Sequence, residues 1–207
     1  MKSANPDVQH FLGIPWCAAL LSEPGIVRDT APSRFPKPST EDQLFSTTLR
    51  TEETIAAYLV FYKRPSSPAS SSSSSPSAAT LAITPGSSGG GNLIREIKAL
   101  LTLRSGVNGY PNVSHGGIVA TVLDETIGMI CSINKAEGGL TSEESYMTAY
   151  LNVTYVRPVA TPQTVLCVVE VVSVKGRKWL IEGRIEDEEG RVLAKAESLF
   201  VRLKEKL

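Results

Sequence analysis

Apolar residues follow two different periods along the chain, and the change between them predicts the secondary structure. From His115 to about Ile133 they recur with helical spacing and cover most of the circumference, which predicts a long helix enclosed on most sides. The segment Thr148–Tyr155 alternates until Arg157-Pro158, as expected of a strand that ends there. The run Val165–Val174 is almost continuously apolar and predicts a central strand.

Turn residues divide the C-terminal third into further strands. Lys175-Gly176-Arg177 predicts a turn into a strand from Trp179 to Ile185, and Glu189-Gly190 predicts a second turn into a strand from Val192 to Ser198. We therefore expect the last four strands to form a meander. Two strands, a long helix and a four-strand meander make an α+β pattern, in which one sheet curls around one helix.

The N-terminal part is less regular. Prolines interrupt residues 1–43, which we interpret as an N-terminal extension packed on the domain, with one short helix near Trp16–Leu21. Residues 44–207 form the domain itself. Its first segment, Leu44–Lys63, predicts a short helix followed by a strand that ends at Tyr62.

A stretch of serine, proline and glycine occupies residues 65–91. It contains almost nothing to bury, so it cannot offset the entropy of ordering, and we expect a disordered insertion in a loop between two strands. The stretch after it, Leu93–Leu103, fits both helical spacing and alternation. Its end at Gly106 and the extended segment around Pro111 favour a strand.

Composition narrows the classes of partner. The 21 basic and 21 acidic residues balance, and no long basic cluster is present, which makes nucleic acid an unfavourable partner. The odd number of widely spaced cysteines, all in apolar stretches, suggests buried thiols in a reducing compartment. Neither His10 nor His115 lies near a Cys or a second His at ligand spacing, so we predict no metal site.

The apolar stretch Phe11–Leu21 is too short to span a bilayer and is interrupted by Pro15. The N-terminal residues are not Arg-rich, as a mitochondrial transit peptide would be. We expect no membrane span and a cytoplasmic location, although a mitochondrial one stays open.

The start of the predicted long helix carries the candidate chemistry. Gly116 and Gly117 precede an apolar helical run, where backbone N–H groups are unpaired and the helix dipole favours an anion. Asp124 lies seven residues beyond Gly117, or roughly 10 Å along the axis, so a substrate must lie along this stripe or reach it from a partner subunit. Glu125 points about 100° away, so we expect only one of the two carboxylates to face a cleft, and we choose Asp124.

Three segments follow one another in an order that is itself informative. They are His115-Gly116-Gly117 with Asp124 nine positions after the histidine, the run Thr148–Pro158, and Val174–Lys178. Together they resemble the hot-dog-fold acyl-CoA thioesterases, of the phenylacetate-pathway type and its eukaryotic thioesterase-superfamily relatives. The resemblance covers about residues 93–203. It implies a sheet wrapped around a central helix, dimers that join their sheets, and active sites at the subunit interface.

The resemblance also implies roles for the residues around the helix start. Asp124 matches the acidic residue that acts as general base on water or as nucleophile. Gly116 matches the glycine whose N–H binds the thioester oxygen, Gly117 assists it, and His115 positions the thioester or the turn. Thr148 matches a hydroxyl residue of the other subunit that orients the water or the carboxylate.

The alternation of side chains along the strand agrees with the assignment of Thr148 to the other subunit. Thr148 falls on the face opposite Ala149 and Leu151, so we expect it to miss the helix of its own chain. Three basic residues, Arg157, Arg177 and Lys178, match positions near the CoA phosphates, and Thr154 lies close to them in the pattern.

Taken with these residues, the resemblance implies a cofactor-free acyl-CoA thioesterase of lipid metabolism, working as a homodimer or dimer of dimers. The alternative is a non-catalytic acyl-CoA or lipid-binding module of the same fold. A hot-dog dehydratase is disfavoured, because Met129 stands where such an enzyme commonly has a histidine five residues after the aspartate.

Overall fold

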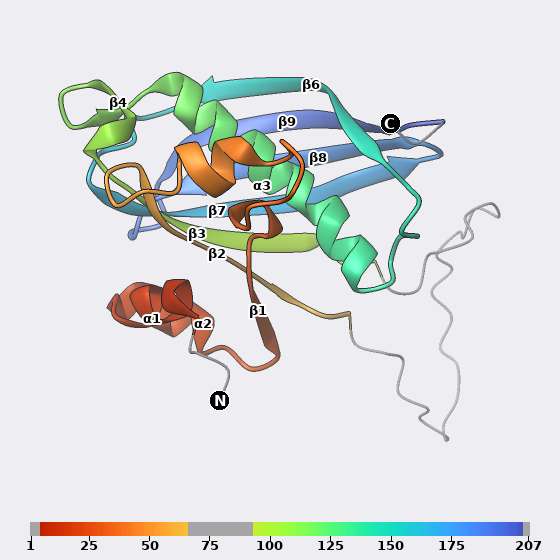
Figure 1. Cartoon of the computed structure of the whole chain (residues 1–207), viewed down its shortest axis with the longest axis horizontal. Coiled ribbons are helices and arrows are strands. Elements are labelled where there is room, and N and C mark those ends of the chain that lie inside the picture. Colours follow the sequence, from red (N-terminus) through yellow and green to blue (C-terminus); the bar gives the residue numbers. More distant parts are fainter. Residues whose placement is uncertain (1–4, 66–92, 205–207) are drawn as a thin grey trace, which may run out of the picture.

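Seven antiparallel strands form one sheet, which curves around a long helix in the computed structural model of the chain (Figure 1). The structure describes residues 5–65 and 93–204. The strands are β1 (Ile26–Thr30), β2 (Ile55–Lys63), β3 (Glu96–Leu103), β6 (Tyr146–Tyr155), β7 (Gln163–Lys175), β8 (Lys178–Glu186) and β9 (Val192–Arg202). Their order across the sheet is β1-β2-β3-β7-β8-β9-β6. The α+β fold with one sheet around one helix is confirmed.

The enclosed helix is α3 (Gly116–Ala136), which ends three residues beyond the predicted end at Ile133. Its apolar side chains, among them Leu123, Ile127 and Ile130, are fully buried in the main core. The length and composition of α3 would also suit a membrane span, but half of its most apolar stretch is buried inside the protein. The all-round hydrophobicity of α3 therefore reflects its enclosure by the sheet.

The other face of the sheet is covered as well, over part of its width. In β2, Tyr58 and Val60 pack in the main core with α3, whereas Leu59 and Phe61 pack in a second core on the opposite face. That second core includes Phe11 from α1 (Pro6–Leu12) and residues of α2 (Pro15–Leu21). Figure 1 shows these two short helices below β2, across the sheet from α3. The apolar run of β2 is explained by its burial on both faces.

The N-terminal extension does more than pack on the domain. The predicted helix near Trp16–Leu21 is present as α2, and β1 joins the sheet by antiparallel pairing with β2. Sequence reasoning missed α1, although Asn5 followed by Pro6 is a helix-start signal, and the Asn5 side chain accepts from the Asp7 N–H. Two short turns follow β1, η1 (Pro32–Arg34) and η2 (Leu44–Thr48), and η2 is the predicted short helix.

The predicted four-strand meander is wrong in one respect. Strands β7, β8 and β9 form a meander, but β6 pairs with β9 at the edge of the sheet instead of with β7. A strand has two edges, and those of β7 are taken by β3 and β8. A small hairpin, β4 (Asn108–Tyr110) and β5 (Val113–Ser114), lies just before α3.

Two further expectations concern the cysteines and the serine-rich insertion. Cys17, Cys131 and Cys167 are free and buried, as predicted, and burial raises the pKa of each thiol to about 12. The expected insertion, residues 65–91, lies outside the described residues apart from Pro65. The strands on either side of it, β2 and β3, are antiparallel neighbours, as expected for a connecting loop.

Candidate active site

A cavity of about 310 Å³ opens beside the middle of α3. Three parts of the chain that are far apart in sequence form its walls: α3, the adjoining strands β6 and β9, and the N-terminal segment around η1. Its lining consists of Pro32, Ser33, Lys37, Glu41, Asp42, Asp124, Glu125, Gly128, Met129, Ser132, Tyr146, Met147, Thr148 and Phe200. The predicted catalytic acid therefore faces a cavity.

One hydrogen bond fixes the Asp124 carboxylate. The Thr148 Oγ1 donates to Asp124 Oδ1 at 3.0 Å, and both residues belong to the same copy of the chain. The prediction that Thr148 misses its own helix is therefore wrong. The strand contains a bulge at this point, since Thr148 pairs with Phe200 and Tyr150 with Leu199, which leaves Ala149 as the extra residue. The extra residue shifts the alternation of side chains between the two faces of the strand by one position, so that Thr148 faces α3 instead of the outer side.

Glu125 lines the same cavity as Asp124, contrary to the expectation that only one of them could. The two side chains still diverge around the helix, but the N-terminal segment covers α3 widely enough for the cavity to reach both. Burial raises the pKa of Glu125 above its usual value, and the nearby Asp42 and Asp124 add to the rise, whereas Ser33 and Lys37 oppose it. The cavity thus holds two carboxylates in different surroundings.

The start of α3 is fixed by two contacts. His115 is the N-cap, and its Nδ1 accepts a hydrogen bond from the Gly117 N–H at 2.9 Å. The Tyr155 hydroxyl donates to the Gly116 carbonyl oxygen at 3.0 Å. The Gly117 N–H is therefore occupied, while the Gly116 N–H, at the first helical position, has no partner among the described residues. Sequence reasoning missed Tyr155, although it lies within the Thr148–Pro158 motif.

Gly116 and Asp124 do not meet within one copy of the chain. They are eight residues apart on one helix, or about 12 Å along its axis, and Gly116 is not part of the cavity lining. A thioester carbonyl cannot bridge that distance. Either group alone is within reach of a substrate held by this copy, and the two act together only if another copy supplies one of them.

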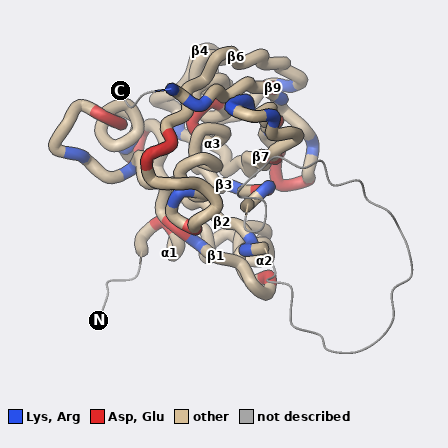
Figure 2. The backbone as a smooth tube through the Cα atoms, turned by 90° about the vertical axis from the view of Figure 1, so that its right-hand side faces the viewer, with Lys and Arg blue, Asp and Glu red and all other residues tan. Residues whose placement is uncertain are grey.

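The structure does not bring the predicted CoA-binding residues together. Arg157 donates to the Val192 carbonyl at one end of β9, and Arg177 donates to the Arg202 carbonyl at the other, roughly 30 Å away. Lys178 follows Arg177 at the start of β8. In Figure 2, Lys and Arg positions are distributed over several parts of the backbone. Within one copy these residues therefore form no common phosphate site.

Thr154 lies apart from all of them. It lines a second cavity, of about 450 Å³, on the outer face of the sheet, together with residues of β7, β8 and β9 such as Glu182 and Lys195. This face points away from α3. A Cβ built on Gly183 of β8 would meet Leu123 and Ile127 of the helix, so the neighbouring Glu182 points to the opposite face of the sheet.

An antiparallel sheet wrapped around one long central helix is the hot-dog fold of the thioesterases. Residues 112–194 match the family model of the thioesterase superfamily. The resemblance noted in the sequence is confirmed.

The chain is also similar to named proteins. Over 98 residues it is 33% identical to the acyl-coenzyme A thioesterase THEM4 of Mus musculus and 32% identical to that of Rattus norvegicus. Each match covers 47% of this chain and 39% of the relative, so the chain spans about two fifths of the length of these relatives.

Among solved structures, the thioesterase superfamily protein RHA08564 is 32% identical, with 51% of each chain covered and a TM-score of 0.45. The BH2602 protein from Bacillus halodurans, solved with CoA, is 28% identical, with 51% of this chain and 66% of that chain covered and a TM-score of 0.45.

Proposed function

We propose that this chain hydrolyses acyl-CoA thioesters to the free acid and CoA, with Asp124 activating the attacking water. The observation that carries the proposal is the Asp124 carboxylate, held by Thr148 and facing a cavity. A carboxylate so placed can accept a proton from water, and the thioesterase names of the curated relatives supply the substrate class.

The chemistry needs a base, a water and a donor for the oxyanion. Thr148 occupies Asp124 Oδ1, which leaves the other oxygen to orient the water. As the water attacks, its proton passes to Asp124, its oxygen bonds to the carbonyl carbon, and negative charge develops on the carbonyl oxygen. Collapse of this intermediate breaks the C–S bond, and the proton passes from Asp124 to the CoA thiolate. The reaction consumes one water and requires no cofactor.

The unpaired Gly116 N–H of a second copy supplies the oxyanion donor in this proposal. Strand β6 runs beside α3, with Thr148 against Asp124 and Tyr155 against Gly116, and its outer edge is unpaired within the described residues. Two β6 strands paired antiparallel, Thr148 against Tyr155 of the second copy, bring each Asp124 to the other copy's Gly116.

The exposed side chains of β6 support a docking edge of this kind. Met147 is 51% exposed and Tyr155 is 56% exposed in the single copy, and Val156 just beyond the strand is 43% exposed. An edge strand that carries such apolar side chains is a favourable site for pairing with another chain. We therefore propose a homodimer, or a dimer of dimers, as the active form.

Replacing Asp124 with Asn tests the proposed base. The Asn side chain keeps the size and an acceptor oxygen for Thr148 but cannot take a proton, so kcat should fall by about 10²–10⁴-fold while the melting temperature and the binding of CoA esters are retained. Thiol release is measured with short, medium, long and aromatic acyl-CoA esters. Asp29→Asn, at an exposed position of strand β1, is the matched control and should keep full activity.

Two outcomes would contradict the proposal. Unchanged turnover in Asp124→Asn would remove this carboxylate from the mechanism. Wild-type protein that binds CoA esters without releasing thiol from any of them would instead favour the non-catalytic acyl-CoA or lipid-binding module.

A further inference from the structure

A buried hydroxyl without a partner lies in the wall of the cavity. Ser33, in the short turn η1, is 5% exposed and lines the cavity, yet its Oγ has no hydrogen-bond partner among the described residues. Buried polar groups are nearly always paired, because an unpaired one has lost its bonds to water without replacement. The Ser33 hydroxyl is therefore available to a group that enters the cavity.

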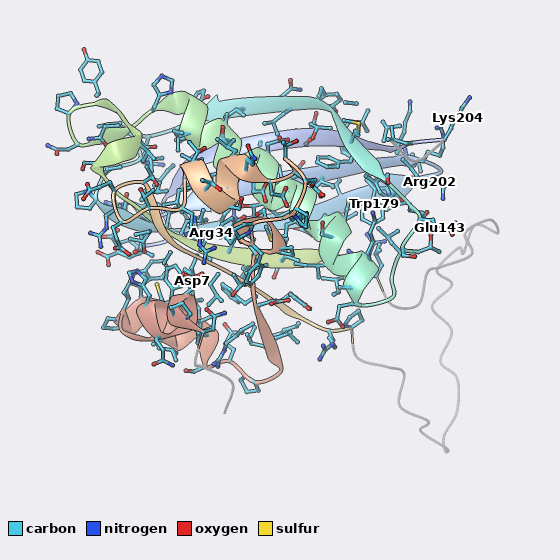
Figure 3. The ribbon with its side chains drawn as sticks, in the orientation of Figure 1. Asp7, Arg34, Glu143, Trp179, Arg202 and Lys204 are labelled. Carbon is cyan, nitrogen blue, oxygen red and sulfur yellow. The ribbon has the colours of Figure 1, made fainter. Side chains whose placement is uncertain are left out.

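The turn that carries Ser33 is held firmly in place. The neighbouring Arg34, labelled in Figure 3, is 3% exposed, and its guanidinium donates to the carbonyls of Leu49 at 3.3 Å and Ile55 at 2.9 Å. In return, Arg50 donates to the Arg34 carbonyl at 2.6 Å. These bonds fix η1 against the start of β2, so the Ser33 hydroxyl keeps its place in the cavity wall.

Glu125 lies on the α3 side of the same cavity, near Ser33. The Ser33 side chain is close enough to lower the pKa of Glu125 against the effect of burial, but no hydrogen bond of normal geometry joins the two. A hydroxyl group between them could bond to both, since a hydroxyl donates once and accepts twice. Part of the wall, formed by Met129, Met147 and Phe200, is apolar and suits methylene groups.

The charges around the cavity decide which part of the substrate enters it. Four carboxylates and one lysine line it, and the Lys37 Nζ is already paired with Glu41 at 2.6 Å and Asp42 at 2.7 Å. This excess of negative charge repels the phosphates of CoA, which leaves the acyl group as the part that extends past Asp124. The same charge repels an acyl group that ends in a carboxylate.

We propose that Ser33 and Glu125 form a specificity subsite for acyl groups that carry a neutral hydroxyl substituent. The subsite rests on the proposed thioesterase function and adds the class of acyl group to it. Ser33 lies outside residues 112–194, which match the thioesterase superfamily. The N-terminal segment of this chain therefore contributes one of the two groups of the subsite, and Glu125 contributes the other.

The test compares six-carbon esters that differ only in their substituents. The wild-type protein is assayed for thiol release with hexanoyl-CoA, with hydroxyhexanoyl-CoA esters bearing the hydroxyl at C3, C4, C5 or C6, and with adipoyl-CoA. At least one hydroxylated ester should exceed hexanoyl-CoA in kcat/KM by about tenfold, the usual effect of one hydrogen bond. Adipoyl-CoA should fall below hexanoyl-CoA by a similar factor.

Variants then assign the preference to its residues. In Ser33→Ala the preference for the hydroxylated ester should fall to about twofold or less, because the bonding partner is gone. Ser46→Ala is the matched control, since Ser46 is equally buried at 5% exposure but does not line the cavity, and it should keep the wild-type preference. Glu125→Gln removes one negative charge and should raise the relative kcat/KM of adipoyl-CoA.

Equal kcat/KM for hexanoyl-CoA and every hydroxylated ester in the wild type would overturn the subsite, and so would a preference that survives in Ser33→Ala. If hexanoyl-CoA and the hydroxylated esters are all hydrolysed with the same kcat/KM, the subsite fails and the proposed function stands. If no ester releases thiol, the proposed function fails. Calorimetric titration of Asp124→Asn with the same pair of esters then still decides the subsite, since equal affinities would refute it.

Discussion

Gly116 offers a direct test of the oxyanion donor at the scale of one residue. It is the first residue of α3, a position where proline is tolerated because the N–H makes no bond within the helix. The preceding His115 has φ −60° and ψ 135°, the extended conformation that a following proline requires. Gly116→Pro therefore removes the N–H while the helix is kept.

In Gly116→Pro, kcat should fall by about 10²–10³-fold, the usual loss for one oxyanion donor, with the circular dichroism spectrum unchanged. Gly116→Ala is the control, because it keeps the N–H and its Cβ would lie 3.5 Å from the Tyr155 ring, an ordinary contact. If the proline variant hydrolyses acyl-CoA as fast as the alanine variant, this N–H is not the donor.

At this scale, the sequence predicted the residues whose signal is local and missed those that depend on tertiary structure. Asp124 and the His115-Gly116-Gly117 turn are recognisable from their spacing along one helix. The contact of Thr148 with its own helix depends on a bulge, which strand alternation does not reveal. Ser33 entered no sequence argument, since it reaches the cavity only because η1 folds across α3.

At the scale of elements, α1 and α2 cover a face of the sheet that would otherwise expose apolar residues of β2, β3 and β7. Phe11 of α1 is fully buried in this second core. Phe11→Ala should lower the free energy of unfolding by about 3–5 kcal/mol, from lost burial and the cavity left behind. Urea denaturation measures the change.

Leu12→Ala is the matched control for that experiment, because Leu12 follows Phe11 in the same helix and is 37% exposed. Its effect should be small, since little apolar area is lost. If the two variants unfold at the same urea concentration, the N-terminal helices do not contribute to the stability of the sheet.

The elements that could be predicted are those with long, regular patterns, above all α3 and the strands β7, β8 and β9. The five residues of β1 have too short a pattern to identify, and only pairing with β2 makes them a strand. The place of β6 was wrongly predicted, because neighbours in sequence usually pair but the partners of β7 come from elsewhere.

At the scale of the whole molecule, the 12 Å between Gly116 and Asp124 determines how activity depends on assembly. If each site combines Asp124 of one copy with Gly116 of another, a single copy is inactive by itself. Each twofold dimer then contains two such sites, and each site draws on both copies.

Mixing two inactive variants tests this arrangement. A heterodimer of Asp124→Asn and Gly116→Pro has one site with both defects and one site with neither. Random pairing of equal amounts makes about half of the dimers mixed, so the mixture should recover about a quarter of the wild-type activity. Different affinity tags on the two variants allow the heterodimer to be isolated and its thiol release measured directly, where half of the wild-type activity is expected. An isolated heterodimer that is as inactive as its parents would mean that Asp124 and Gly116 of different copies do not share a site.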